Sequence, residues 1–123
     1  MDDCNAGLMK HLGMRFVHVA PDRVVAELDI TEALTTAGGA VHGGTLMALA
    51  DTVGAAGTAA AGLRTATLES KTNFFAAANA GTLRAESSAL HKGRRTHVWQ
   101  TRVTDAGGRL LSLTIQTQMI LDK

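Results

Sequence analysis

Residues 40–63 read AVHGGTLMALADTVGAAGTAAAGL, a run of small apolar residues that contains one acid, Asp51. The run predicts a long helix over about 43–61. An unpaired carboxylate is costly in a packed core, so Asp51 needs either a hydrogen-bonding partner or a chemical role. Thr52, Thr58 or a solvent-filled gap would provide the first, and the residues at the start of the helix favour the second.

The segments around this helix predict an antiparallel sheet. A short helix over 5–13 precedes strand-like segments at 15–20 and 23–30, and an irregular loop over 31–42 leads into the long helix. Four further strands are expected at 65–75, 82–92, 96–103 and 109–121. Short turns separate them, so we expect successive strands to pair as a meander. Because the helix is apolar on nearly every face, one curved sheet should wrap it, with a partner chain covering the rest.

The composition indicates one domain over 1–123. The chain has 12 Lys and Arg against 11 Asp and Glu, one Trp and no Tyr, so it lacks the basic surface and stacking rings of a nucleic-acid-binding protein. Asp51 disfavours a membrane span, because aspartate at a helix centre costs about 2.5–3.5 kcal/mol on insertion. The acidic N-terminus has no signal-like apolar core and Cys4 has no second cysteine to pair with, which together favour a cytoplasmic protein.

The remaining histidines do not form a metal-binding pattern. His11, His18, His91 and His97 show no ligand-like spacing with the cysteine or with acids. We therefore expect no metal ion in this protein.

The start of the helix has the groups that acyl chemistry requires. Backbone N–H groups at a helix start are free and carry partial positive charge, and Gly43 and Gly44 would let a substrate oxygen approach closely. Such an N–H can stabilise an oxyanion, while Asp51 can act on water as a base or on a carbonyl carbon as a nucleophile. The alternative interpretation is that the two glycines form only a tight entry into the helix.

The distance between these groups predicts a dimer. Eight helical residues separate Gly43 from Asp51 by about 12 Å, which is too far for both to reach one carbonyl. One site therefore needs the helix start of one chain and the acid of a second, arranged about a two-fold axis. This arrangement gives a homodimer with two equivalent sites for hydrolysis of an activated acyl group.

Three stretches resemble one known family. VHGGTLMALADTVG at 41–54, TLESKTNFF at 67–75 and HKGRRTHV at 91–98 are similar to the hotdog-fold acyl-CoA thioesterases of the phenylacetate-degradation (PaaI-like) type, which include one class of 4-hydroxybenzoyl-CoA thioesterase. The resemblance implies an α+β hotdog fold, in which an antiparallel sheet of five or six strands wraps a long central helix. It also implies dimers that pair into tetramers, and an acyl-CoA substrate that includes coenzyme A, so that no separate cofactor is needed.

The resemblance also implies roles for single residues. Asp51 matches the family's acid, and Gly43 of the opposite chain matches the amide that polarises the thioester carbonyl. His42 is expected to shape the loop and contact the thioester, with a purely structural role as the alternative. Thr67 takes the place of a hydroxyl that helps to hold the attacking water. Thr36 stands where relatives usually carry Asn or Gln, and its shorter side chain can donate only one hydrogen bond.

Several residues are expected to bind the substrate. Gly44 continues the helix start beside the carbonyl. Lys92, Arg94 and Arg95 lie in the region that the family places near the nucleotide of coenzyme A, where their charges would pair with its phosphates. A solvated turn is the alternative interpretation of these three cations.

The acyl pocket is expected near the end of the first strand after the helix. Phe74 and Phe75 alternate on that strand, so one should enter the core and the other should line the pocket. The family's usual Arg-Pro is absent and Phe-Ala-Ala-Ala at 75–78 replaces it, so the rim of the site departs from the family pattern.

The leading hypothesis is therefore an acyl-CoA thioesterase. A non-catalytic acyl-CoA binding or sensing protein is the first alternative, but an acid beside a thioester is unfavourable for a protein that only holds its ligand. A dehydratase or hydratase acting on acyl thioesters is the second, and such enzymes usually need a histidine paired with a carboxylate in one site. Release of a free thiol is expected only from the thioesterase.

Overall fold

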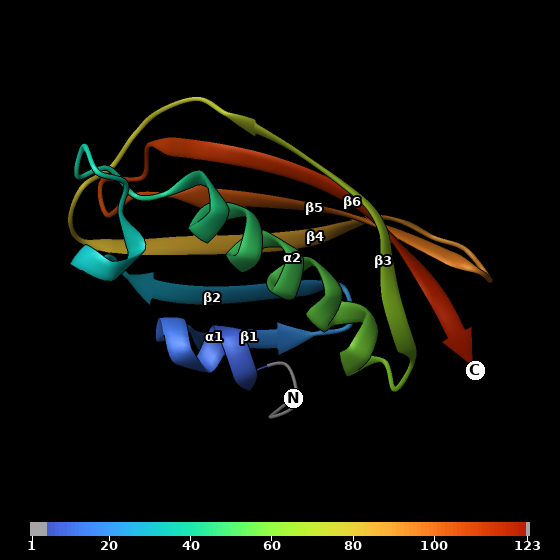
Figure 1. Cartoon of the computed structure of the whole chain (residues 1–123). Helices are drawn as coiled ribbons and strands as arrows, with labels where there is room; N and C mark the ends of the chain where they lie inside the picture. Colours follow the sequence, from blue (N-terminus) through green and yellow to red (C-terminus); the bar gives the residue numbers. More distant parts are fainter. Residues whose placement is uncertain (1–4, 123) are drawn as a thin grey trace.

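The computed structural model describes residues 5–122 and shows one antiparallel sheet curved around a long helix (Figure 1). The elements are, in chain order, α1 (Gly7–Leu12), β1 (Arg15–Ala20), β2 (Arg23–Asp29), the 3₁₀ turn η2 (Glu32–Leu34), α2 (Gly43–Ala60), β3 (Arg64–Phe74), β4 (Thr82–Lys92), β5 (Thr96–Thr104) and β6 (Leu110–Asp122). The expected α+β hotdog fold is confirmed, with six strands. Cys4 lies outside the described residues. Within them, no helix combines the length and the apolar character needed to span a membrane.

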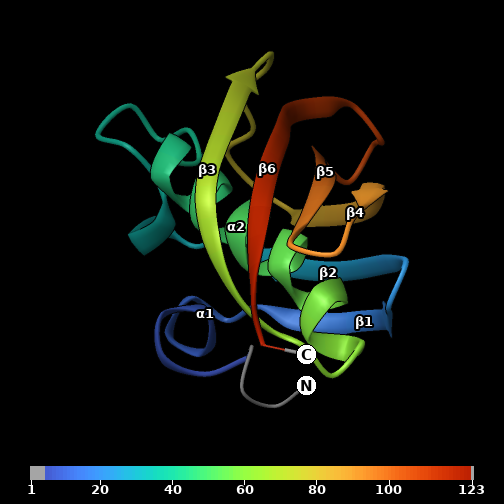
Figure 2. The same cartoon turned by 90° about the vertical axis from the view of Figure 1, so that its right-hand side faces the viewer.

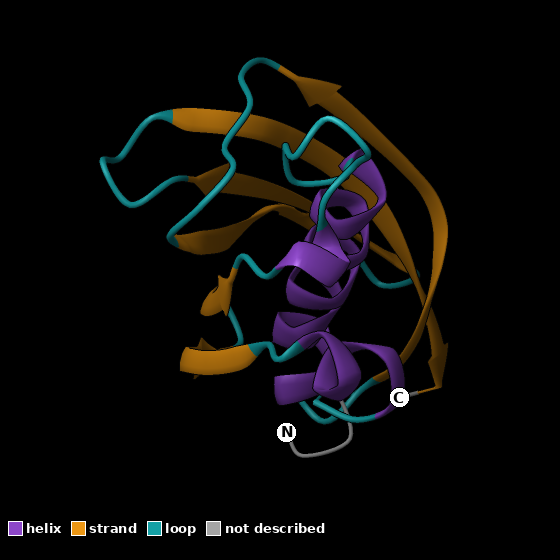
Figure 3. Ribbon diagram, turned by 60° about the vertical axis from the view of Figure 1, so that its left-hand side comes forward, coloured by secondary structure: helices purple, strands orange, loops and turns teal. Residues whose placement is uncertain are grey.

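The strand order corrects one expectation. The order is β1-β2-β4-β5-β6-β3, so the expected meander is right for β4, β5 and β6 and wrong for β3, which pairs with β6 at the far edge (Figure 2). The reason is the path of α2, which lies on the inner side of the curved sheet (Figure 3). The helix contacts every strand and delivers the chain to the edge opposite β1. Segment 75–81 then returns to β4, and Phe75 N–H donates to Leu111 O at 2.8 Å on the way.

Glycine lets α2 lie close to the sheet. Leu49 on the helix is fully buried, and a Cβ added at Gly57 would lie 2.1 Å from the ring of Trp99 on β5. The indole is buried, and its Nε1–H donates to Thr58 Oγ1 at 2.9 Å. His97 Nδ1 lies 2.8 Å from the same hydroxyl. Thr58 is therefore bonded to the sheet and is not the partner of the acid.

Strand β6 carries its polar residues inward. The side chains on its inner face are all buried: Ser112, Thr114, Gln116 and Gln118. On the outer face, Ile115 and Met119 are exposed. This pattern is the reverse of the usual alternation, in which apolar residues face the core.

A bulge at Leu68 determines which residues of β3 face α2. Thr67 and Glu69 pair with adjacent residues of β6, which leaves Leu68 as an extra residue in β3. Because side chains alternate along a strand, residues seven positions apart would otherwise lie on opposite faces. With the bulge, Thr67 and Phe74 both contact α2.

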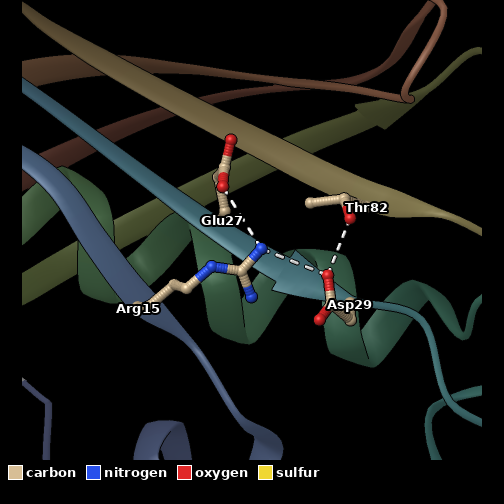
Figure 4. Close-up of polar contacts among 4 residues, drawn as sticks. All are labelled: Arg15, Glu27, Asp29 and Thr82. Atoms are coloured by element: carbon tan, nitrogen blue, oxygen red, sulfur yellow. Dashed lines mark hydrogen bonds and ion pairs between the residues drawn. The ribbon is translucent and has the colours of Figure 1, made fainter.

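Charged contacts hold the opposite edge of the sheet. Arg15 on β1 forms ion pairs with Glu27 and Asp29 on β2, each at 3.2 Å, and Thr82 on β4 donates to Asp29 at 2.7 Å (Figure 4). The Thr82 hydrogen bond, followed by the Arg15 bond, holds the pKa of Asp29 below its usual range. These side chains are largely open to solvent, so their contribution to stability is small.

Candidate active site

Asp51 lies near the middle of α2 and contacts β3. The residue is exposed, and Thr67 on β3 donates its hydroxyl hydrogen to Asp51 Oδ1 at 2.7 Å. The structure therefore brings together two of the residues expected in the site. Among the described residues, Asp51 Oδ2 has no hydrogen-bonding partner, so this oxygen is open to water or substrate.

Two buried amides behind Asp51 are absent from the sequence-based predictions. Gln116 Nε2 lies 3.2 Å from both Asp51 Oδ1 and Asp51 O. It also donates to Gln118 Oε1 at 2.8 Å, and the Thr67 hydroxyl lies 2.7 Å from that same oxygen. The available signal was the spacing of two glutamines two residues apart, which puts both on one face of a strand. A polar strand face is normally assigned to solvent, and the signal is lost in that assignment.

The start of α2 presents a free amide. His42 is the N-cap residue, and its Nδ1 accepts a hydrogen bond from Gly44 N–H at 2.7 Å. The hydrogen of a neutral ring is therefore assigned to Nε2. The Gly43 N–H has no acceptor among the described residues, which is the state required of an oxyanion-binding donor. The cap fixes the position of the His42 ring at the start of α2, and its contact with a thioester stays a prediction.

Phe74 covers the start of α2. A Cβ added at Gly43 would lie 3.2 Å from Phe74 Cζ, so glycine leaves room for the ring. Phe74 and Phe75 are 51% and 58% exposed, so the expectation that one of them enters the core is wrong for the described chain. The reason is that β3 is an edge strand, and no further strand among the described residues covers the rings.

Thr36 lies in the loop that precedes α2. Its hydroxyl oxygen accepts a hydrogen bond from Gly38 N–H at 3.2 Å, and its carbonyl oxygen accepts one from Gly39 N–H at 2.9 Å. A bridge between Thr35 and Val41 closes the loop. In residues 5–122 no hydrogen bond joins Thr36 to the candidate acid, so its part in the site stays a prediction.

The three cations of the β4–β5 turn differ in their surroundings. Lys92 donates to Pro21 O, and its Nζ lies 5.7 Å from the centre of the Trp99 ring. Arg94 and Arg95 are exposed, and neither guanidinium forms an ion pair within the described chain. The two guanidinium groups are therefore open to an anionic ligand, and the binding role of Lys92 stays a prediction.

A hollow of about 270 Å³ opens beside the start of α2. Its lining is largely apolar and comes from α1, η2 and α2: Leu8, Leu12, Ala33, Thr35, His42, Gly44, Thr45 and Ala48. A larger hollow of about 410 Å³ is lined by 77–80 and 105–107 among others, and neither the acid nor the free amide contributes to it. The smaller hollow is thus the one adjacent to the candidate site.

Residues 38–112 match the family model described as the thioesterase superfamily, and this segment includes α2, β3 and Asp51. The chain belongs to this family. The thioesterase is 32% identical over 111 residues to the 1,4-dihydroxy-2-naphthoyl-CoA hydrolase of Listeria monocytogenes, which covers 88% of this chain and 90% of that relative. It is 30% identical over 117 residues to the 1,4-dihydroxy-2-naphthoyl-CoA hydrolase of Escherichia coli, with 89% and 83% covered.

A solved structure agrees with this assignment. The crystal structure of S. sahachiroi AziG superposes on the thioesterase with a TM-score of 0.92 at 28% identity, over 96% of this chain and 98% of that one. Because the family is one of thioesterases and the similar sequences are named as CoA-ester hydrolases, the protein is a thioester hydrolase. The non-catalytic and dehydratase alternatives are set aside.

Proposed function

We propose that this thioesterase hydrolyses an acyl-CoA thioester to the free acid and coenzyme A in the PaaI-like manner. Asp51 is the reacting acid, and Gly43 of the partner subunit is the oxyanion donor. The observation that carries the proposal is the state of the Asp51 carboxylate, in which Thr67 holds Oδ1 at 2.7 Å and Oδ2 is open among the described residues. The two relatives named as 1,4-dihydroxy-2-naphthoyl-CoA hydrolases support a coenzyme A ester as substrate.

Strand β3 supports a homodimer. It is an 11-residue strand at the end of the sheet, and its outer edge has no partner among the described strands. A long exposed edge is normally covered in the native assembly. We infer that two β3 edges pair antiparallel about a two-fold axis. The exposed Ile115 and Met119 on the outer face of β6 support a further pairing of dimers into a tetramer.

Each end of β3 carries one half of the proposed site. Near its start Thr67 contacts Asp51, and at its end Phe74 covers Gly43. In an antiparallel pair of β3 strands, the start of one strand lies beside the end of the other. The acid of one chain thereby approaches the free amide of its partner. Within one chain the two groups cannot meet, because about 12 Å along the helix separates them.

The reaction consumes one water molecule per thioester. The amide of the partner's Gly43 donates to the carbonyl oxygen and stabilises the negative charge that develops there. Asp51 Oδ2 either takes a proton from water while the water oxygen attacks the carbonyl carbon, or attacks that carbon itself and forms an anhydride that water then cleaves. In both routes the C–S bond breaks, the thiolate of coenzyme A takes up a proton, and the acyl group leaves as the acid.

Separate parts of the surface are proposed to bind the two halves of the substrate. The unpaired guanidinium groups of Arg94 and Arg95 would meet the phosphates of coenzyme A. The apolar hollow beside the start of α2 would receive the acyl group, and its small Ala33 and Ala48 leave space for it. Thr36 would approach the carbonyl from the preceding loop.

Hydrolysis of a panel of thioesters by wild type and Asp51→Asn tests the proposal. The panel includes 1,4-dihydroxy-2-naphthoyl, phenylacetyl, benzoyl and straight-chain CoA esters, and thiol release is followed with a thiol-reactive dye. Asp51→Asn is expected to lose turnover while keeping its melting temperature and its oligomeric state. A fully active Asp51→Asn protein would contradict the assigned role of the carboxylate.

A further inference from the structure

A pair of buried glutamines on β6 lies directly behind the Asp51 carboxylate. Gln116 is fully buried and Gln118 is 1% exposed, so both amides are enclosed by protein. Gln116 Nε2 lies 3.2 Å from Asp51 Oδ1 and 2.8 Å from Gln118 Oε1. The Thr67 hydroxyl oxygen lies 2.7 Å from Asp51 Oδ1 and also 2.7 Å from Gln118 Oε1. The four side chains therefore form a closed ring of polar contacts that includes Oδ1.

The fold gives up stability to keep this ring. A Cβ at Gly54 of α2 would lie 2.3 Å from Gln116 Oε1, so the helix carries glycine there although alanine is more favourable in a helix interior. Gln116 Oε1 has no hydrogen-bonding partner among the described residues, and a buried oxygen in that state is unfavourable. An apolar side chain at 116 would avoid the unpaired oxygen. Stability therefore does not explain Gln116, whereas its contact with Asp51 does.

We propose that Gln116 and Gln118 are positioning residues for the Asp51 carboxylate, a role that rests on the proposed function. Gln116 contacts Oδ1 directly, and Gln118 holds both the Gln116 amide and the Thr67 hydroxyl that contact Oδ1. Fixing one carboxylate oxygen leaves Oδ2 as the oxygen that meets water and substrate. The two glutamines act through Asp51 and Thr67, and neither touches the reacting atoms.

Gln118 also gives the Thr67 hydroxyl a second acceptor. A hydroxyl has one hydrogen and can donate to only one of two acceptors at a time. While Asp51 is ionised, its charged carboxylate is the stronger acceptor. When the carboxyl group takes a proton from water, that charge is lost, and the hydroxyl hydrogen can turn to Gln118 Oε1. Gln118 thus keeps Thr67 in place in both states of the acid.

The test replaces each glutamine by methionine, which has a similar length and no amide. The kcat of Gln116→Met and of Gln118→Met is expected to fall roughly 10- to 100-fold, the range seen for residues that orient a metal ligand, with KM nearly unchanged. The melting temperature of Gln116→Met should stay at or above that of wild type, because the unpaired buried oxygen is removed. Gln100→Met is the matched control, since Gln100 lies on β5 with its side chain on the outer face of the sheet, and it should keep wild-type kcat.

Two further variants show whether the effect passes through the ring. In a background that carries both Gln116→Met and Thr67→Val, Gln118→Met should cause little additional loss of kcat, because both groups through which Gln118 acts are already absent. Gly54→Ala should lower kcat as Gln116→Met does, because the new Cβ displaces the Gln116 amide. Gly54→Ala also tests the proposal if a methionine variant does not fold.

The outcomes separate this proposal from the proposed function. Unchanged kcat in folded Gln116→Met, Gln118→Met or Gly54→Ala, beside an inactive Asp51→Asn, overturns the positioning role and leaves the thioesterase mechanism intact. A further loss of kcat when Gln118→Met is added to the Gln116→Met and Thr67→Val background overturns it as well, and so do losses of kcat that only follow a lowered melting temperature. A fully active Asp51→Asn protein overturns the mechanism itself.

Discussion

A mixed dimer provides the sharpest test of a site shared between two chains. Gly43→Pro removes the free N–H of α2, and proline is well tolerated at the first position of a helix. The preceding His42 has φ −68° and ψ 138°, which is the extended conformation that proline favours in its neighbour. Gly43→Ala is the matched control, because it keeps the N–H and places a Cβ 3.2 Å from Phe74 Cζ. Asp51→Asn removes the acid in the second variant.

The expected rates follow from counting intact sites. The Gly43→Pro homodimer should lose roughly 10²–10³ in kcat, the usual effect of deleting one oxyanion donor, and the Asp51→Asn homodimer should be inactive. In a heterodimer of the two variants, one site contains both defects, and the other combines the intact acid of one chain with the intact amide of its partner. The heterodimer should therefore recover about half of the wild-type rate per dimer.

The assay uses two affinity tags on co-expressed variants. Successive purification on both tags isolates the heterodimer, and a thiol-reactive dye follows the release of coenzyme A. Heterodimers as inactive as their parents would show that acid and amide act within one chain. Wild-type chains that yield no doubly tagged dimer would show that the shared site does not exist. Either result would refute the reasoning from β3.

Other substitutions test the packing of α2, the acyl site and a surface ion pair. Gly57→Ala should lower the free energy of unfolding, measured in urea, by about 1–3 kcal/mol, because the new Cβ would lie 2.1 Å from the Trp99 ring and overpack the core. This cost exceeds the stability that alanine adds to a helix interior. Ala48→Leu should fill the hollow beside α2 and lower kcat/KM for bulky aromatic CoA esters more than for acetyl-CoA, which a substrate panel measures. Arg23 forms an ion pair with Glu86 at 2.7 Å and lowers the pKa of that carboxyl below its usual value of 4.5. The pair therefore stabilises the fold fully at pH values above 4.5, and this contribution is lost as the pH falls through the lower pKa of the folded state. Thermal melts of Glu86→Gln should accordingly show a deficit at pH 7 that shrinks as the pH falls below 4.5. The deficit at pH 7 should be less than about 1 kcal/mol because the two side chains are 42% and 40% exposed.

The single helices and strands can be predicted from the sequence, because the residues within each one and at its ends determine it. The small apolar run predicts α2 to within one residue of its observed end at Ala60, and the segment 82–92 coincides with β4. The strand order is a different kind of property, since the partner of β3 depends on where α2 delivers the chain. The turn-like residues at 78–81 suggest a hairpin between β3 and β4, whereas 75–81 runs across to a strand that is not the neighbour of β3.

The candidate site also contains residues that the sequence predicts and residues that it does not. Asp51 is recognisable because an acid is unusual in an apolar run, whereas Thr67 is one of several hydroxyl residues on β3 and is singled out only by the family resemblance. Gln116 and Gln118 escape prediction because alternation along β6 favours a core that contains Ile115 instead. The structure reverses these faces because the inner side of β6 meets Asp51, where amide groups can hydrogen-bond and aliphatic ones would leave the carboxylate unsupported.

The extra residue at Leu68 also constrains how this strand can evolve. Its loss would restore plain alternation to β3 and turn either Thr67 or Phe74 to the outer surface. In a symmetric dimer a single deletion of this kind would damage both centres at once. Lineages should therefore diversify β3 by exchanging side chains at constant length, and insertions or deletions should accumulate in the 75–81 connection.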